Sequence, residues 1–478
     1  MALATPNLAQ KLTHDSYDFI LYGLKAAAGK KLKRRGSGKP EEVSMKPAAQ
    51  INRRSFLAGL TAYVPELWPL LAEEELPPVR AITRGPKFHW FGYYDKLQFD
   101  PAGRHVLANQ VDFEHRSPRA EDVIKIGMVD LQDGDRWIEL GETRAWTWQQ
   151  GCMLQWLPGS KSEIIWNDRA GDQFVSHILD VRTRKKRTLP GAVYSLSPDG
   201  RAAIAPDFRR LNDCRPGYGY AGIPDPNRAL RAPEDAGLWQ MDMRTGKRKL
   251  LITFAQAAQL RFQEKSRPVH SDPAKAKHWF NHLLYAPGSR RFLFLHRWRV
   301  FEGPDRQPTF STRMFTADPD GRDLYIVDPY GGTSHFIWRD PRHICAWAWH
   351  PSHGEKFYLY EDQTDNVSVV APEVMTVNGH ITYLPHRNNQ WILNDTYPDK
   401  GRLQHPYLYH LPTHRRVPLG HFHSPPEYSG EWRCDLHPRY SSDGRKVVID
   451  STHEGQGRQM YLIDISKIVE GRTRPPRE

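Results

Sequence analysis

Short hydrophobic runs separated by tight polar turns recur along the chain from residue 81 onward. The clearest unit is AVYSLSPDGRAAIAPDFRR (192–210), in which two apolar runs flank the turn SPDG. Apolar runs joined by a short glycine-containing turn predict a β-hairpin. The pattern recurs at 88–140, 146–188, 190–252, 279–329, 333–371, 378–418 and 432–467. Repeats of roughly 40–50 residues built from short strands are typical of a β-propeller. The sequence therefore predicts an all-β fold, a seven-bladed β-propeller.

The first 80 residues lack this strand pattern and predict a helical or flexible N-terminal leader. Arg53 and Arg54 precede Ser55-Phe56-Leu57 and a mildly apolar segment, as in a twin-arginine export signal. An amphipathic helix packed beside the propeller is the alternative. We expect a leader at 1–80, the propeller at 81–468 and a tail at 469–478, in a protein exported to the periplasm or the cell exterior.

Composition and charge narrow the function classes. The formal net charge is +12, but residues 1–54 supply +7 of it, which leaves a modest +5 for the remainder. This charge permits an anionic partner, and no nucleic-acid-binding motif accompanies it. No run of 18 apolar residues is present, so no membrane span is expected. Four cysteines are too few for a disulfide scaffold.

Four histidines occupy matching places, each just ahead of a predicted innermost strand. They are His282, His335, His380 and His437. Equivalent positions at the start of the innermost strands face the axis of a propeller, so the four side chains should converge. A divalent metal is the usual reason to gather histidines. Cys434, three residues before His437, is a further candidate ligand as the thiolate. The alternative is four separate core histidines, each hydrogen-bonded within its own blade.

Tyr194 occupies nearly the same place in the third blade. The strand after the SPDG turn runs back toward Arg209 and Arg210, and residues equidistant from a hairpin turn lie opposite each other. A phenol beside a guanidinium should have a lowered pKa, which suits proton transfer. A structural tyrosine and a surface arginine are the alternative.

The first blade supplies two more candidates near the expected mouth of the propeller. His89 is a candidate general base, and His115 is a candidate charge-neutralising donor. Two inserts, at 211–236 and 254–278, are too long for hairpin turns. Long loops on a rigid scaffold commonly carry ligand-binding residues.

These features together resemble the propeller polysaccharide lyases. The predicted blades, the axial histidines, CDLHPRYSSDGRKVVIDS (434–451) and SHFIWRD (334–340) are similar to oligogalacturonate lyase. That family has Gln where this chain has Cys434, and a further His where it has Arg439. The resemblance implies a metal site at the axis. The sulfur of Cys434 favours zinc over manganese or calcium.

The chain also resembles the ulvan lyases, which use a Tyr, an Arg sixteen residues later and two upstream histidines. Tyr194 and Arg210 have that spacing, with His89 and His115 upstream. The resemblance implies an enzyme that cleaves an anionic, uronate-containing oligo- or polysaccharide by β-elimination. A non-catalytic propeller that binds a glycan or a protein, with a structural metal, is the leading alternative. A glycoside hydrolase is a second alternative, although no convincing carboxylate pair is evident.

Overall fold

The computed structural model describes residues 76–260, 272–303, 306 and 309–471. Residues from Pro77 onward belong to one compact unit. The candidate export signal at Arg53 and Arg54 lies outside the described residues, and so does the end of the tail, 472–478. In the described part of the chain, no helix is long and apolar enough to cross a membrane.

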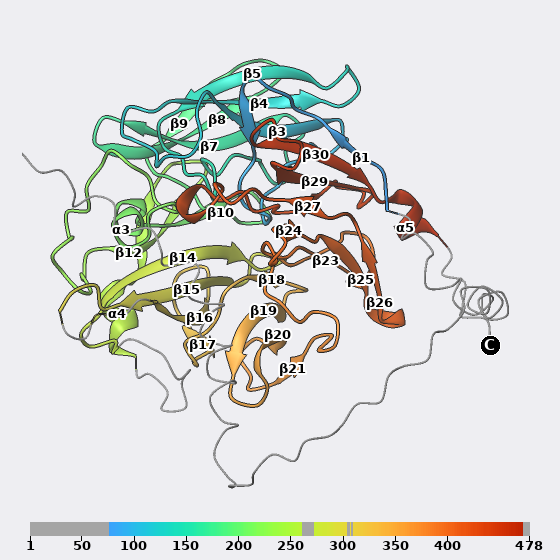
Figure 1. Ribbon diagram of the computed structural model, residues 1–478. Helices are drawn as coiled ribbons and strands as arrows, with labels where there is room; N and C mark the ends of the chain where they lie inside the picture. Colours follow the sequence, from blue (N-terminus) through green and yellow to red (C-terminus); the bar gives the residue numbers. More distant parts are fainter. Residues whose placement is uncertain (1–75, 261–271, 304–305, 307–308, 472–478) are drawn as a thin grey trace, which may run out of the picture. The chain divides into compact units, whose positions relative to one another are not determined.

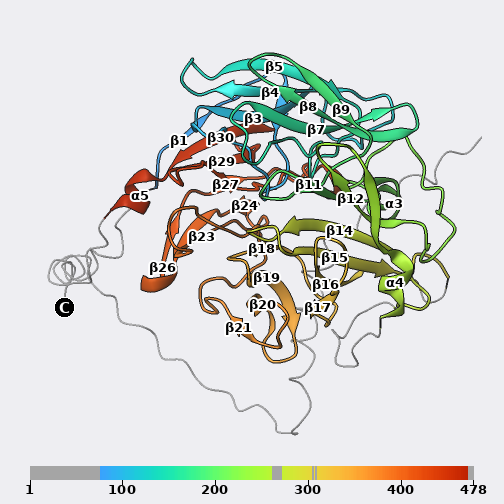
Figure 2. The same ribbon diagram turned by 180° about the vertical axis from the view of Figure 1, so that it is seen from behind.

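Seven four-stranded antiparallel sheets follow one another around a ring, so the expected seven-bladed propeller is confirmed (Figures 1 and 2). The first sheet contains β2 (Phe88–Trp90), β3 (His105–Val111), β4 (Ile124–Asp130) and β5 (Arg136–Thr143). The second contains β6 (Gln155–Trp156), β7 (Glu163–Ala170), β8 (Gln173–Asp180) and β9 (Lys186–Leu189). The third contains β10 (Ser195–Leu196), β11 (Ala202–Pro206), β12 (Gly237–Asp242) and β13 (Arg248–Thr253).

The remaining sheets repeat this order. The fourth contains β14 (Lys277–Tyr285), β15 (Phe292–Arg299), β16 (Ser311–Ala317) and β17 (Tyr325–Asp328). The fifth contains β18 (Phe336–Trp338), β19 (His343–His350), β20 (Gly354–Glu361) and β21 (Val367–Val369). The sixth contains β22 (Thr382–Tyr383), β23 (Trp391–Asn394), β25 (Tyr407–His410) and β26 (Arg415–Pro418). The seventh contains β28 (Arg439–Tyr440), β29 (Lys446–Ser451), β30 (Gln459–Asp464) and β1 (Val79–Ala81).

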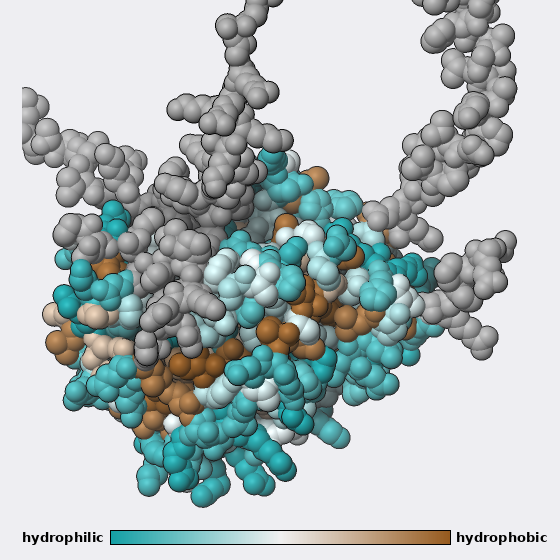
Figure 3. All heavy atoms as spheres, turned by 90° about the horizontal axis from the view of Figure 1, so that it is seen from below, coloured by the Kyte–Doolittle hydropathy of each residue, from teal (hydrophilic) through white to brown (hydrophobic). Residues whose placement is uncertain are grey.

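Hydrophobic side chains fill the spaces between adjacent sheets. One cluster joins the first and second sheets and includes Trp90, Trp146, Trp148 and Trp166. Strands buried on both faces read as nearly continuous apolar runs, which is why the hairpins were recognisable in the sequence. Figure 3 shows hydrophilic side chains over most of one face, with a band of hydrophobic residues between them.

The other elements lie in the connections. They are α3 (Phe208–Cys214), α4 (Phe254–Gln259), α5 (Ser466–Glu470), η2 (Leu411–Thr413), η3 (Gly430–Trp432) and a two-stranded sheet of β24 (Leu403–Gln404) and β27 (Phe422–His423). Helix α3 opens the 211–236 insert and packs against β14. Asp207 caps it by accepting hydrogen bonds from two backbone amides of the first turn.

The ring is closed by the two ends of the described chain. Strand β1 pairs antiparallel with β30, so the N-terminal strand completes the last sheet. A buried ion pair reinforces this closure: Arg439 Nη2 lies 2.6 Å from Asp450 Oδ1. Arg439 Nε also donates a hydrogen bond to Oε1 of Gln98 at 2.9 Å, and Gln98 lies in the connection between β2 and β3 of the first sheet. The position where the resemblance implied a metal-binding histidine therefore holds an arginine that joins the seventh sheet to the first.

We predict that Arg439→Met lowers the melting temperature strongly, because it leaves Asp450 buried without its partner. Breaking a buried ion pair typically costs about 3–5 kcal/mol. The matched control is Arg136→Met, which removes an exposed pair with Asp133 and should cost under about 1 kcal/mol. Thermal unfolding followed by circular dichroism measures both. Equal melting temperatures for the two variants would contradict the closing role of Arg439.

Candidate functional site

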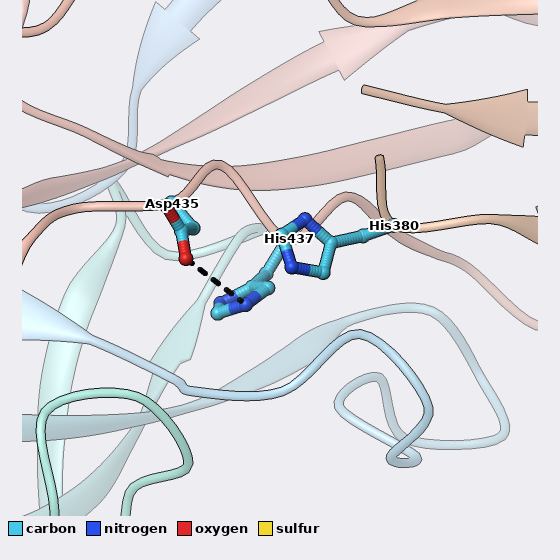
Figure 4. Close-up of side chains that lie close together, drawn as sticks. All are labelled: His380, Asp435 and His437. Carbon is cyan, nitrogen blue, oxygen red and sulfur yellow. Dashed lines mark ion pairs between the residues drawn. The ribbon is translucent and has the colours of Figure 1, made fainter. Parts of the chain in front are cut away.

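Three buried side chains bring potential metal-ligand atoms together at the axis. Ligand atoms of His380, Asp435 and His437 all lie within 4.8 Å of one another (Figure 4). His380 precedes β22 and His437 precedes β28, so each stands at the start of an innermost strand. Asp435 Oδ2 lies 3.9 Å from His437 Nε2. We call these three residues the axial metal group.

Asp395 orients this group. Its carboxylate oxygens each lie 3.0 Å from His380 Nδ1, and they also accept the backbone amides of His380 and His437. A carboxylate on Nδ1 keeps the proton there and leaves the lone pair of Nε2 directed at a metal. One buried carboxylate thus sets the ring of one ligand and the backbone of the other.

The residues present fit a divalent metal. Nε2 of His380 and Nε2 of His437 are both buried, and neither has a hydrogen-bond partner in the described part of the chain. Leaving two ring nitrogens buried and unbonded is costly unless a ligand takes them up. Two imidazole nitrogens and a carboxylate oxygen are ligands of first-row divalent metals.

Cys434 is not part of the group, which corrects the expected ligand set. Its neighbour Asp435 supplies the ligand-type atom in its place. Burial raises the pKa of the Cys434 thiol well above its usual value. The preference for zinc rested on this sulfur and loses its basis.

His335 lies beside the axial metal group. Its ring centroid is 4.2 Å from that of His380, but its Nδ1 lies 2.9 Å from Asn378 Oδ1. Its Nε2 lies 3.4 Å from the hydroxyl of Tyr397. The axial direction predicted for His335 is therefore observed, with both ring nitrogens facing protein partners.

His282 reaches the axis from a β-bulge. The β14–β15 register shifts between Asn281 and Leu283, and His282 has a φ of 49°. Its Nε2 lies 3.4 Å from the Tyr93 hydroxyl, and its Nδ1 lies 3.2 Å from the Tyr194 hydroxyl. The Tyr93 ring stacks on His282 at 4.8 Å and also contacts His437 at 5.1 Å. A phenol ring thus stands between His282 and the axial metal group.

The structure does not bring Tyr194 and Arg210 together. Strand β11 ends at Pro206 and helix α3 follows, so the expected hairpin return does not extend to Arg210. The buried Arg210 guanidinium pairs with Asp225 at 3.1 Å and donates to backbone carbonyls of the insert. Burial, followed by the charge of Asp95, raises the pKa of Tyr194 well above its usual value. The expectation of a lowered pKa at Tyr194 was wrong.

His89 and His115 lie elsewhere. His89 is buried, with Nδ1 3.0 Å from Gln459 Oε1 and Nε2 accepting a hydrogen bond from Gln110 at 2.8 Å. Both of its ring nitrogens are therefore engaged. His115 is exposed and packs on the ring of Tyr428 at 4.7 Å. Among the described contacts, none links either histidine to the axial metal group.

The insert supplies a tyrosine that the sequence interpretation did not single out. Tyr218 is buried, and its ring centroid lies 5.6 Å from that of His282. Its hydroxyl accepts a hydrogen bond from Arg433 Nη2 at 2.8 Å, and the Arg215 guanidinium lies 4.8 Å from its ring centroid. Burial favours the neutral phenol, but Arg433 and Arg215 outweigh it and lower the pKa of Tyr218. The sequence signals were the length of the insert and its richness in Gly, Pro and Tyr.

Comparison with known proteins supports the fold. No family model and no curated protein sequence matches the chain. Among solved structures, an oligogalacturonate lyase in complex with manganese is similar, with a TM-score of 0.57 and 14% identity over 84% of this chain and 96% of that one. An oligogalacturonate lyase from Vibrio parahaemolyticus gives 0.54 and 14%, over 82% and 96%. At this identity the likeness establishes a shared propeller architecture, and activity has to be argued from the residues.

We predict that the protein binds about one equivalent of a first-row divalent metal, with manganese as the probe, and that His437→Ala abolishes this binding, because it removes a metal-group nitrogen. His282→Ala should retain the metal, since the ring nitrogens of His282 face the hydroxyls of Tyr93 and Tyr194. Asp395→Asn should weaken affinity by roughly 10–100-fold through loss of ring orientation. Equilibrium dialysis with elemental analysis measures all three. Metal loss in His282→Ala together with retention in His437→Ala would contradict the assignment.

Proposed function

We propose that this protein is a metal-dependent polysaccharide lyase that cleaves a uronate-containing glycan by β-elimination. The observation that carries the proposal is the axial metal group lying beside a buried tyrosine that two arginines activate. The likeness to the oligogalacturonate lyases supports it at the level of the fold. Export through the candidate twin-arginine signal would place the enzyme where such glycans occur, and this localisation stays a prediction.

β-Elimination sets three chemical requirements. The proton on C5 of a uronate is very weakly acidic while the adjacent carboxylate keeps its charge. The site must therefore neutralise the carboxylate, remove the C5 proton and protonate the oxygen leaving C4. The product carries a C4–C5 double bond.

Tyr218 is our candidate for the base. The Arg433 hydrogen bond and the Arg215 guanidinium both stabilise the phenolate, which a proton-abstracting tyrosine needs. The cation nearest Tyr194 is Lys96, 4.6 Å from its ring centroid, and Asp95 pairs with that cation, while the Tyr194 hydroxyl is held by Gln150 and His282. We therefore assign proton abstraction to Tyr218 and give His89, His115 and Arg210 no part in the chemistry.

Tyr397 is our candidate for the acid that protonates the leaving oxygen. It is half-buried and lies next to His335 at 3.4 Å. Burial, followed by the negative charge of Asp435, raises the pKa of Tyr397 far above its usual value, so it keeps its proton at neutral pH. Two tyrosines whose surroundings shift their pKa values in opposite directions are suited to acid and base roles.

The metal would be held by His380, Asp435 and His437. When bound there, it supplies positive charge that can neutralise a substrate carboxylate. Arg433 Nε donates to Asp435 Oδ2 at 2.8 Å, so the same arginine that activates Tyr218 also positions this carboxylate. The metal ligand and the base are thus linked through one guanidinium.

A non-catalytic propeller that binds a glycan or a protein, with the metal as a structural staple, is the second candidate. The near-complete burial of the metal group favours it, since His380 is 2% exposed and His437 is 3% exposed. A structural metal would link the blades and would not require that a substrate reach it. A measurement of glycan turnover distinguishes the lyase from the non-catalytic binding protein.

We predict that ultraviolet absorbance rises when the protein is incubated with one member of a uronate panel. The panel contains pectin fragments, ulvan, glycosaminoglycans and rhamnosyl-glucuronate glycans. Tyr218→Phe should lower kcat/KM by roughly 10²–10⁴-fold, as expected for loss of a general base. Tyr330→Phe is the control and should leave kcat/KM unchanged, because Tyr330 follows β17 and packs on Trp349 and His350 of the fifth sheet. No rise with any glycan, in folded and manganese-loaded protein, would favour the binding-module function.

We also predict that kcat/KM rises with pH and levels off above the Tyr218 pKa, which lies below the ordinary phenol value. The sign follows because the base acts in its deprotonated form. Arg215→Met removes a charge that lowers this pKa, so the rising limb should move to higher pH. A pH–rate profile of both proteins tests this. An unshifted profile would reject Tyr218 as the base.

A further inference from the structure

Arg297 stands out among the buried arginines of the propeller. It lies on β15, is 4% exposed, and makes no hydrogen bond or ion pair through Nε or Nη1 with any described residue. Other arginines near the axis have acidic partners. Arg433 pairs with Asp435, and Arg439 pairs with Asp450. A buried cation without a counter-ion destabilises a fold, so its presence calls for a ligand.

Arg215 lies next to Arg297 and is half-buried. The two guanidinium carbons lie 4.4 Å and 4.7 Å from the centroid of a single ring, that of Phe310. Arg215 Nε is also buried without a hydrogen-bond partner in the described residues. Two like charges on one aromatic ring repel each other, and an anion between or beside them would relieve the repulsion.

The two arginines lie near the proposed chemistry. Burial lowers the pKa of Arg297 to about 10, with Arg215 the next cause, so the group stays charged at neutral pH. The charge of Arg297 also lowers the pKa of His282, after the larger effect of burial. Lys96, the other buried cation there, is neutralised by Asp95 at 2.8 Å. Arg215 and Arg297, by contrast, form no ion pair with an acidic side chain in the described part of the chain.

We propose that Arg297 and Arg215 form a carboxylate-binding subsite, separate from the axial metal group, for a second uronate unit of the substrate. Guanidinium groups bind carboxylates through paired, charge-assisted hydrogen bonds. The metal group takes the carboxylate of the reacting sugar, and the arginine pair takes that of a neighbouring sugar. The ligand is then a glycan with at least two acidic units. The choice of uronate rests on the proposed function.

The test measures thermal stability of the full chain with sodium D-galacturonate or D-glucuronate, against galactose or glucose at matched ionic strength. At about ten times the dissociation constant, the uronate should raise the wild-type melting temperature by on the order of 2 °C. Arg297→Met should lose this shift, with affinity reduced roughly 10–100-fold. Without ligand, the variant should melt at or above the wild-type temperature, since an uncompensated charge is gone.

Two controls and a second variant make the result specific. Arg322→Met, which changes an exposed arginine, should keep the shift. His437→Ala should also keep it, because the subsite is separate from the metal group. Arg215→Met provides a second variant and should weaken the shift, so the test does not depend on one substitution folding.

Two results would overturn the subsite. One is an equal uronate-specific shift in wild-type and Arg297→Met protein, and the other is no such shift in the wild type. A retained, Arg297-dependent shift with no double-bond formation on any glycan would reject the lyase activity and keep the subsite. The stability assay and the absorbance assay therefore fail independently.

Discussion

The closure of seven sheets into one ring is the constraint on which the site depends. Only a closed ring brings the starts of the innermost strands to a common axis, where segments far apart in sequence meet. Strand β1 closes it by pairing with β30, and Arg439 reinforces the junction through Asp450 and Gln98. Arg439 Nη1 also donates to the carbonyl of His437 at 2.5 Å. The residue that closes the ring thereby fixes the backbone of a metal-group residue, so fold stability and site geometry share one side chain.

The local features of the fold were predictable from the sequence, and the contacts between distant segments were not. Hairpins can be recognised in a sequence as apolar runs joined by short turns. The repeat of these hairpins therefore predicted the blade boundaries and the axial placement of His380 and His437. Asp435 was overlooked because the more distinctive Cys434 stands beside it, and side-chain direction alternates along an extended segment. The φ of 42° at His437 and the bulge at His282 redirect side chains in ways that no pattern of residue types reveals. Arg210 was misplaced because helix α3 begins immediately after β11.

Electrostatics gives the axis its chemical character. Asp395 holds the His380 tautomer, Arg433 joins Asp435 to Tyr218, and Asp95 neutralises Lys96. Each of these charges is compensated within the protein. Nε2 of His380, Nε2 of His437, and Nε and Nη1 of Arg297 lack hydrogen-bond partners among the described residues. Unsatisfied groups of this kind cost stability, and they concentrate where a protein receives a metal or a ligand. The two imidazole nitrogens could bind one cation, and the Arg297 guanidinium could bind one anion.

The most direct test of this account is a crystal structure of the protein grown with manganese, with an anomalous difference map. We predict one strong axial peak within coordination distance of Nε2 of His380, Nε2 of His437 and a carboxylate oxygen of Asp435. A peak bound instead by Cys434 or His282, or an axis without a peak in manganese-saturated crystals, would contradict it.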